Sequence, residues 1–292
     1  MKFGIMFAST GPFATAEGAT TMATAADSCG IESIWSVEHV VIPDGYQSKY
    51  PYHTSGKIPG EADADIPDPL IWLAFAAGCT TNVRLGTGIL IVPQRNPLVL
   101  AKECATLDKL SNGRFMLGIG VGWLEEEFNA LGLPFADRGP RTDDYVRAMQ
   151  ALWTQEKATY RGEFADFSGA ISRPFPTQAG GVPIVVGGHS KAAARRAGRL
   201  GDGFFPISAN EEDLVGLLDL MKDTARENGR DGDAVEVTVG TWSPRRDSLD
   251  RVKELEDMGI DRLIVAPPTG NIAKLPEAIE AIAEKVAPVA TM

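Results

Sequence analysis

The chain has 292 residues, of which 44% are hydrophobic, and its formal net charge is −11. It contains no run of 18 or more apolar residues, so the sequence predicts no membrane-spanning helix. The acidic excess argues against nucleic acids and membrane surfaces as partners, because both are bound by basic faces. The short apolar run after Lys2 is typical of a first strand rather than of a signal peptide, so we expect a cytoplasmic protein.

Apolar segments alternate with amphipathic ones along the chain. Most of the apolar segments are short and rich in Ile, Val, Leu or Phe, which is typical of parallel strands covered by helices. They span residues 2–7, 33–37, 84–92, 115–120, 182–186, 203–206, 235–241 and 262–266. Eight strands alternating with helices predict one α/β domain over residues 1–292, a (β/α)8 TIM barrel. An open, doubly wound sheet is the alternative that these segments leave open.

The segments between the strands carry helix start and stop signals. Asp68 and Asn96 each precede a proline, and such pairs place a capping side chain before a proline in the first helical turn. The acidic residues 211–213 suit the positive end of a further helix. Gly30 is expected to end the first helix.

Two insertions are longer than the connections of a plain barrel. Residues 38–67 are rich in Pro, Gly, Tyr and Asp and follow the second strand, at the C-terminal face where active sites of this fold lie. Residues 158–181 are interpreted as a hairpin with its turn at Arg161-Gly162. Because long loops without a helix are usually functional, we expect Tyr46, Tyr50 and Tyr52 of the first insertion to cover the site.

Glycines interrupt two of the predicted strands. Gly86 and Gly88 lie in the third strand, and Gly118, Gly120 and Gly122 lie at the end of the fourth. A glycine in a strand marks the close approach of a ligand or of another chain segment, and the sequence leaves both open. The second run lacks the spacing of a dinucleotide fingerprint, so a Rossmann site is not favoured. The acidic residues 125–127 that follow are interpreted as a solvated first helical turn.

A further glycine pair follows the fifth strand. Gly187, Gly188, His189 and Ser190 precede an alanine-rich helix, whose exposed N–H groups would form a ready anion site. The sequence therefore indicates a phosphate-binding loop, with a simple helix cap as the alternative.

His39 stands directly after the second strand, beside Glu38 and at the catalytic face of the predicted barrel. It is the strongest catalytic candidate among the three histidines, and a structural role is the alternative that its position leaves open. The histidines share no metal-ligand spacing, so no metal site is predicted. Neither a GxSxG elbow nor a cysteine beside a histidine supports hydrolase chemistry.

Taken together, these segments resemble the luciferase-like family of flavin- and F420-dependent oxidoreductases. The matching segments are residues 33–39, 85–90, 96–97, 110–114, 117–122, 138–139, 187–188 and 201–203. The resemblance runs from Met1 to about Pro206 and is weaker beyond. Residues 38–43, with Tyr46 and the Tyr50-Pro51-Tyr52 segment, look like the subgroup that uses F420.

The resemblance implies a role for each matching segment. The residues that would bind the cofactor are Thr87, Gly88, Ile89, Leu90, Gly120, Val121, Gly122, Gly187, Gly188, His189 and Ser190. The first four would form the bulge under the cofactor ring, with a cis peptide bond between Gly88 and Ile89. Residues 120–122 would line the polar side chain of the cofactor, and residues 187–190 would contact its phosphate. Glu38 and His39 would be catalytic, as an acid–histidine pair beside the ring.

The chain departs from the sugar-phosphate and alcohol dehydrogenases of this family at two positions. Those enzymes have a tryptophan four residues after the histidine, where this chain has Pro43. Their catalytic glutamate directly follows the glycine run, where this chain has Trp123. The resemblance therefore does not imply glucose 6-phosphate or a simple alcohol as the substrate.

The resemblance implies an F420-dependent oxidoreductase that transfers a hydride between deazaflavin F420 and a small organic substrate. One alternative is a reduced-FMN monooxygenase on the same barrel, because deazaflavin lacks the N5 atom that supports oxygen chemistry. Another is a non-catalytic flavin or F420 carrier, which would show no cavity above the ring. A homodimer is compatible with the resemblance.

Overall fold

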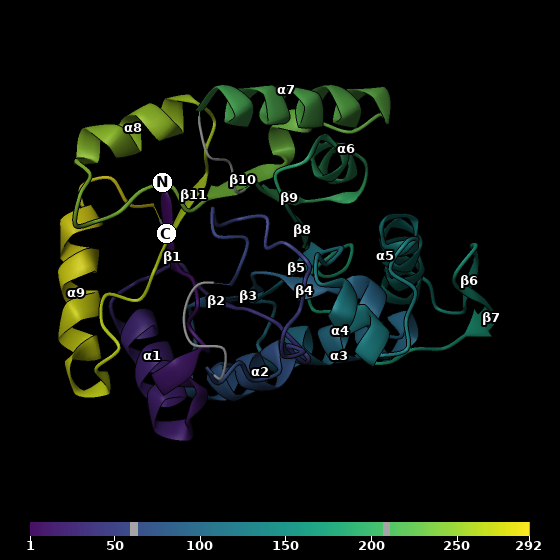
Figure 1. Ribbon diagram of the computed structural model, residues 1–292, viewed down its shortest axis with the longest axis horizontal. Coiled ribbons are helices and arrows are strands. Elements are labelled where there is room, and N and C mark those ends of the chain that lie inside the picture. The colour runs from purple at the N-terminus through teal and green to yellow at the C-terminus, as the bar shows by residue number, and fades with distance from the viewer. Residues whose placement is uncertain (59–63, 207–210, 292) are drawn as a thin grey trace.

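Figure 1 shows the computed structural model, which describes residues 1–58, 64–206 and 211–291. The barrel strands are β1 (Lys2–Ile5), β2 (Ser33–Ser36), β3 (Arg84–Thr87), β4 (Leu90–Ile91), β5 (Phe115–Gly120), β8 (Ile184–Gly187), β9 (Gly203–Phe205), β10 (Glu236–Val239) and β11 (Arg262–Val265). They pair in the order β3-β2-β1-β11-β10-β9-β8-β5-β4, and the parallel pairing of β3 with β5 closes the ring. Because β3 and β4 are consecutive pieces of one predicted strand, the sheet is a closed eight-stranded barrel, and the predicted (β/α)8 fold is confirmed.

Helices cover the outside of the barrel (Figure 1). They are α1 (Ala16–Ser28), α2 (Pro69–Cys79), α3 (Pro97–Leu110), α4 (Glu125–Ala130), α5 (Arg138–Thr154), α6 (Lys191–Leu200), α7 (Glu211–Glu227), α8 (Leu249–Asp257) and α9 (Leu275–Val286). The side-chain oxygens of Asp68 and Asn96 each accept two N–H bonds of 3.0 to 3.2 Å, which confirms both predicted caps. Gly30 has a φ of 71° just after α1, as expected of a residue that ends a helix. In the part of the chain that the structure describes, no helix is long and apolar enough to cross a bilayer.

Large side chains fill the barrel interior. The rings of Trp35 in β2 and Phe205 in β9 lie 6.1 Å apart, and since these strands are not neighbours in the sheet, the contact crosses the barrel. A Cβ atom on Gly86 would lie 2.5 Å from the Trp35 ring, and one on Gly118 would lie 1.8 Å from the carbonyl oxygen of Thr87. These two glycines therefore serve tight packing rather than ligand binding.

The second insertion forms the predicted hairpin, from β6 (Ala158–Arg161) and β7 (Asp166–Ala170). It is held against α5 by Asp144, whose Oδ2 accepts the N–H groups of Phe164 at 2.8 Å and Ala165 at 2.9 Å. Figure 1 shows the hairpin beyond α5, on the side away from the barrel. The first insertion instead lies at the carboxyl ends of the strands, and its residues 59–63 are outside the described residues.

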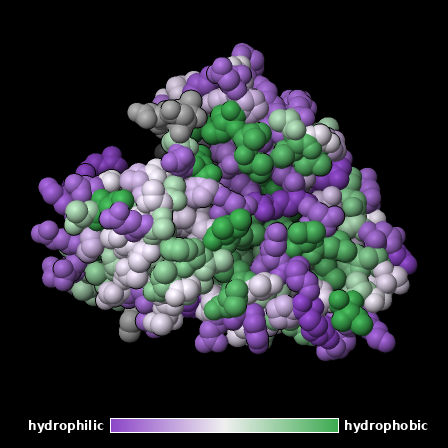
Figure 2. Space-filling model, turned by 90° about the horizontal axis from the view of Figure 1, so that it is seen from below, coloured by the Kyte–Doolittle hydropathy of each residue, from purple (hydrophilic) through white to green (hydrophobic). Residues whose placement is uncertain are grey.

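Exposed apolar side chains gather on two neighbouring helices. They are Ile71 and Phe75 of α2 and Leu98 and Val99 of α3. Figure 2, seen from the side on which α1, α2 and α3 lie, shows several apolar groups on this face between hydrophilic ones. The homodimer stays a prediction, and this face is the surface on which to test it first.

Candidate active site

A pocket of about 1300 Å³ opens at the carboxyl ends of the barrel strands. Its walls come from residues that end or follow β1, β2, β3, β5, β8, β9 and β11 and from the first insertion. Ligand pockets usually measure about 300 to 1,000 Å³, so this one has room for a cofactor together with a second molecule. The insertion lies at this face, as its position after the second strand predicts.

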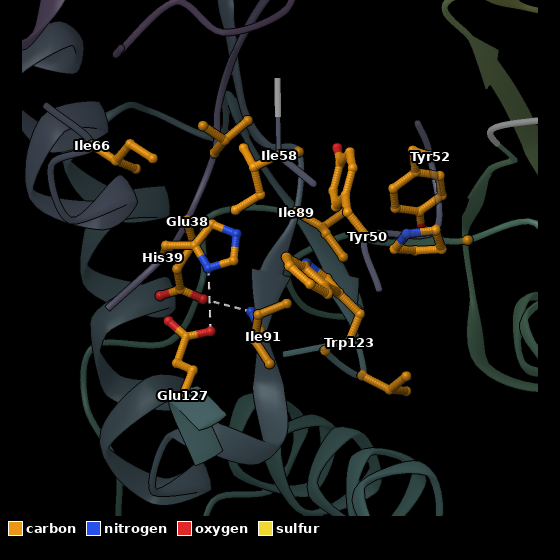
Figure 3. Close-up of a pocket in the computed structure, with 18 of the residues that line it drawn as sticks. Glu38, His39, Tyr50, Tyr52, Ile58, Ile66, Ile89, Ile91, Trp123 and Glu127 are labelled. Carbon is orange, nitrogen blue, oxygen red and sulfur yellow. Dashed lines mark hydrogen bonds and ion pairs between the residues drawn. The ribbon is translucent and has the colours of Figure 1, made fainter. Parts of the chain in front are cut away.

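Ile89 projects into the pocket from the link between β3 and β4 (Figure 3). The peptide bond between Gly88 and Ile89 is cis, as the family resemblance implies. A Cβ atom on Gly120 would lie 1.7 Å from Cδ1 of Ile89, and one on Gly187 would lie 2.7 Å from its Cγ2. These glycines therefore make room for the Ile89 side chain. We call Gly88, Ile89, Gly120 and Gly187 the Ile89 shelf.

Two residues predicted to bind the cofactor do not line the pocket. Thr87 is fully buried, and its Oγ1 donates to the carbonyl oxygen of Gly118 at 2.7 Å. Leu90 is fully buried in the main hydrophobic core. The structure contradicts a direct contact of these two side chains with a ligand, because Thr87 binds Gly118 of β5 and Leu90 packs in the hydrophobic core. The predicted residues that do line the pocket are Glu38, His39, Gly88, Ile89, Gly120, Val121, Gly122, Gly187, Gly188, His189 and Ser190.

The loop after β8 leads into the start of α6 at one end of the pocket. The Oγ of Ser190 accepts the N–H of Ala193 at 3.1 Å, so Ser190 is the N-cap of α6. The N–H of Gly188 donates to the carbonyl oxygen of Phe205 at 3.1 Å and is not free for a ligand. Among the described residues, no acceptor is found for the N–H groups of Ser190 and Ala192, which both line the pocket. An anion at this end would therefore bind to the first turn of α6.

Two arginines add positive charge near the start of α6. Arg138 lines the pocket and donates from Nε to the carbonyl oxygen of Gly122 at 3.1 Å. Arg196 also lines the pocket, and its guanidinium pairs with Asp143. Asp143 also pairs with Arg199 at 2.8 Å, so Arg138 and Arg196 both leave positive charge at this end of the pocket for an anionic ligand.

His39 faces the pocket and is held by Glu127 of α4. Its Nδ1 lies 3.2 Å from Oε2 of Glu127, as the dashed line in Figure 3 marks. A carboxylate only accepts hydrogen bonds, so we assign the Nδ1 proton to His39. Nε2 then lies on the opposite side of the ring, where it can exchange a proton with a molecule in the pocket.

Glu127 also fixes the backbone that carries His39. Its Oε1 accepts the N–H groups of Val40 at 2.7 Å and Val41 at 3.2 Å. Burial works against ionisation of Glu127, but the hydrogen bonds that it accepts, from His39 first and from the backbone of Val41, hold the pKa of Glu127 below its usual value. Glu127 is therefore a carboxylate that positions both the imidazole and the start of the first insertion.

The sequence predicts a solvated helical turn for residues 125–127, and for Glu127 this is wrong. The run does begin α4, but the Glu127 side chain is only 2% exposed. Leu124 and Phe128 are buried beside it. Glu127 and Phe128 stand three and four residues after Leu124 and so lie on the same face of a helix. Because Leu124 and Phe128 are apolar, this spacing could have predicted that Glu127 faces inward.

Glu38 lines the pocket and binds residues other than His39. Its Oε2 accepts the N–H of Ile91 at 2.5 Å, and its Oε1 accepts from Arg95, which also pairs with Asp68 at 2.7 Å. Burial raises the pKa of Glu38, and the charge of Arg95 opposes that effect. Glu38 therefore does not pair with His39, whose Nδ1 lies beside Glu127. Glu38 instead positions β4 and, through it, the Ile89 shelf.

A row of aromatic rings runs along the pocket. Edge-to-face contacts with centroid distances of 5.1 to 5.9 Å join, in order, His39, Trp123, Tyr50, Tyr52 and His189, and Tyr46 packs on Trp123 at 5.6 Å. Burial raises the pKa of Tyr52 to about 12, so its hydroxyl stays protonated near neutral pH. The three tyrosines of the first insertion line the site, as the sequence predicts.

We expect Glu127→Gln to lower turnover at least tenfold without a matching loss of ligand affinity. A glutamine amide would donate to Nδ1 of His39 and reverse the tautomer, which takes the acceptor away from Nε2. Steady-state kinetics and a ligand titration measure the two effects. Glu126→Gln is the matched control, because Oε1 of Glu126 accepts only loop N–H groups, from Gln47 at 2.6 Å and Ser48 at 3.1 Å. Equal turnover in both variants would contradict the assigned role of Glu127.

The chain is similar to characterised and uncharacterised proteins over most of its length. The profile of the family described as luciferase-like monooxygenase matches residues 1–257. An uncharacterised protein of Mycobacterium tuberculosis is 31% identical over 290 residues, which cover 98% of this chain and 99% of that protein. An F420-dependent glucose-6-phosphate dehydrogenase of Kineococcus radiotolerans is 32% identical over 74% of this chain and 60% of its own length. An FMNH2-dependent dimethylsulfone monooxygenase of Pseudomonas putida is 30% identical over 54% of this chain and 44% of its own length.

Solved structures share the fold. An F420-dependent tetrahydromethanopterin reductase from Methanopyrus kandleri superposes with a TM-score of 0.76 at 18% identity, over 98% of both chains. A monooxygenase from Streptomyces bottropensis superposes with a TM-score of 0.76 at 24% identity, over 99% of both chains. Both F420-dependent and FMN-dependent proteins are thus among the relatives. The match over residues 1–257 shows that this chain belongs to the luciferase-like monooxygenase family.

Proposed function

We propose that the protein is an F420-dependent oxidoreductase that transfers a hydride between deazaflavin F420 and a small organic substrate. The observation that carries the proposal is the meeting, in one pocket, of the Ile89 shelf, the open start of α6 and His39 held by Glu127. Family membership supports a redox reaction. The resemblance of residues 38–52 to the F420-dependent subgroup supports the choice of cofactor.

Three parts of the pocket support this choice of cofactor. The Ile89 shelf offers a smooth apolar surface for a flat ring, because its glycines leave only the Ile89 side chain exposed to the pocket. Residues 120–122 begin at Gly120 of the shelf, line the pocket and would follow the polar side chain of the cofactor. The N–H groups of Ser190 and Ala192, together with Arg138, would hold the phosphate.

His39 would hold or move a proton at Nε2, beside the ring. A bound deazaflavin supplies hydride transfer and, lacking the flavin N5, no oxygen chemistry. Glu127 fixes the orientation of the imidazole, and Glu38 fixes the strand that carries the shelf. The tyrosines of the first insertion would shield the reacting atoms from water, which strengthens the electrostatic effect of His39.

A reduced-FMN monooxygenase is the second candidate, and the FMNH2-dependent relative favours it. The same shelf and the same phosphate site would serve FMN, so the cofactor decides the reaction. A carrier without activity fits less well. Such a protein needs no space above the ring, whereas this pocket exceeds the usual volume for one ligand.

We expect F420 to bind at least tenfold more tightly than FMN, a difference of about 1.4 kcal/mol. The reason is the subgroup resemblance at residues 38–52, which form one wall of the pocket. Parallel fluorescence titrations of the same preparation with F420 and FMN measure both affinities. Equal affinities, or a preference for FMN, would favour the reduced-FMN monooxygenase over the F420-dependent oxidoreductase.

We expect Gly188→Val to weaken cofactor binding about tenfold or more. Gly188 has a φ of 117°, which a branched side chain adopts only under strain, and its Cβ would lie 3.2 Å from Cβ of Ala193. The substitution would therefore shift the start of α6 away from the phosphate. Gly216→Val on α7 is the control, since a Cβ there meets nothing within 4 Å. If Gly188→Val binds F420 normally while folded, as judged by circular dichroism, the phosphate lies elsewhere.

A further inference from the structure

Part of the pocket lies beyond the surfaces proposed for the cofactor. The Ile89 shelf and the start of α6 account for the walls at β4, β5 and β8. The remaining wall comes from residues that follow β1, β2 and β11 and from the first insertion. We call it the apolar end after its side chains Met6, Phe7, Ile42, Ile58, Ile66 and Pro267, although Thr10, Lys57 and Thr269 also line it. Figure 3 shows Ile58 and Ile66 on the His39 side of the pocket, away from Tyr52, so the apolar end adjoins His39.

The acids that line the pocket near the apolar end are paired, and Lys57 binds Tyr46. Glu127 pairs with His39, and Glu38 pairs with Arg95. The Nζ of Lys57 donates to the carbonyl oxygen of Tyr46 at 2.5 Å and lies 3.9 Å from the centre of its ring. Asp65 is exposed and does not line the pocket. Among the described residues, a ligand carboxylate at this wall would have to draw the Lys57 ammonium away from Tyr46, whereas an apolar group would gain by burial.

Phe7 is the most unusual residue of the apolar end. Its φ is 56°, in the left-handed region that favours glycine or asparagine and is rare for a bulky side chain. Hydrogen bonds on both sides impose this bend, from the N–H of Met6 to β11 at 2.8 Å and from the N–H of Ala8 to Trp35 at 3.0 Å. The bend turns the ring out of the core, so that Phe7 is 44% exposed and lines the pocket. Strained residues of this kind cluster at ligand sites.

We infer that the apolar end takes the uncharged, apolar body of the substrate, and that Phe7 is a specificity-determining contact for it. The inference rests on the proposed function, because the cofactor surfaces define which part of the pocket is left. It adds a substrate class: a neutral molecule whose reactive group points to His39 while its apolar part lies between Phe7 and the isoleucines of the first insertion.

Two matched aromatic ketones test this inference by binding alone. Methyl 4-acetylbenzoate is neutral, and 4-acetylbenzoate is its carboxylate at neutral pH. Equilibrium dialysis against the protein with F420 bound should show at least tenfold tighter binding of the ester. Equal binding of the two probes, tighter binding of the carboxylate, or no saturable binding of the ester would overturn the inference.

Variants of Phe7 separate contact from backbone strain. Phe7→Gly accepts the left-handed backbone without strain, so it should fold at least as stably as the wild type yet bind the ester about tenfold more weakly. Phe7→Leu keeps an apolar contact and should lose only about threefold. F420 affinity should stay within twofold in both variants. Wild-type affinity of Phe7→Gly for the ester would overturn the role of Phe7.

Measuring F420 binding before ketone binding distinguishes a failure of this inference from a failure of the proposed function. Failure of F420 to bind, seen before any ketone is added, would contradict the cofactor proposal. Discrimination between the two ketones is then measured on the same protein without F420, since the apolar end belongs to the chain itself. F420 binding without discrimination would contradict only the inference drawn here.

Discussion

His39→Ala should lower turnover by at least about a hundredfold and leave F420 affinity within a few-fold of the wild type. A well-placed proton donor or acceptor typically contributes 10² to 10⁴ in rate, and Nε2 of His39 is the group that faces the pocket. The surfaces proposed for the cofactor, the Ile89 shelf and the start of α6, remain intact in this variant. The assay follows F420 absorbance during reduction of a ketone, beside a titration with F420.

His39→Asn is the matched variant for this test. It keeps a polar side chain beside Glu127 but cannot carry the proton, so it should fold like the wild type and turn over almost as slowly as His39→Ala. Near-normal turnover of His39→Ala together with weak F420 binding would contradict the catalytic role. It would make His39 a residue that holds the ring.

Glu38→Ala should lower the free energy of unfolding by about 3 to 5 kcal/mol, the usual effect of removing one partner of a buried ion pair. Glu38 is 2% exposed. Its loss would leave Arg95 with Asp68, which is 33% exposed, and the more distant Glu103, and would leave the N–H of Ile91 without its acceptor. Urea unfolding measures the change. Glu103→Ala is the control, since Glu103 lies 3.9 Å from Arg95 and is 44% exposed, and it should change stability by less than about 1 kcal/mol.

Glu38→Gln separates a structural role from a catalytic one. A glutamine can still accept from Ile91, so this variant should remain folded and keep turnover within about threefold of the wild type. A loss of a hundredfold in turnover at normal stability would show that Glu38 takes part in proton transfer after all.

Much of the fold could be predicted because its signals are local. The eight apolar segments, the caps at Asp68 and Asn96 and the glycine after α1 each depend on residues close together in the sequence. The position of the first insertion followed from barrel geometry alone, since a loop after a strand must lie at the carboxyl end. The cis bond at Gly88–Ile89 came from the family resemblance and not from the residues themselves.

The partners within the site could not be predicted, because they are distant in the sequence. His39 and Glu127 are 88 residues apart, and Glu38 and Arg95 are 57 apart. Glu38 is adjacent to His39 in sequence, but its carboxylate binds Ile91 and Arg95 and does not bind the imidazole. Barrel closure therefore pairs Glu38 with Arg95 and leaves His39 to Glu127, neither of which the sequence predicted. It also brought Glu127 to His39, although Trp123 replaces the glutamate that related dehydrogenases carry after the glycine run.

The most direct test of the account is a crystal structure of the protein with F420 bound. We expect the deazaflavin ring to lie against the Ile89 shelf and the phosphate to bind the N–H groups of Ser190 and Ala192. Nε2 of His39 should lie beside the open face of the ring. The apolar end, with Phe7, should remain open next to that face. A ring bound away from Ile89, or a His39 imidazole released from Glu127 and turned out of the pocket, would contradict it.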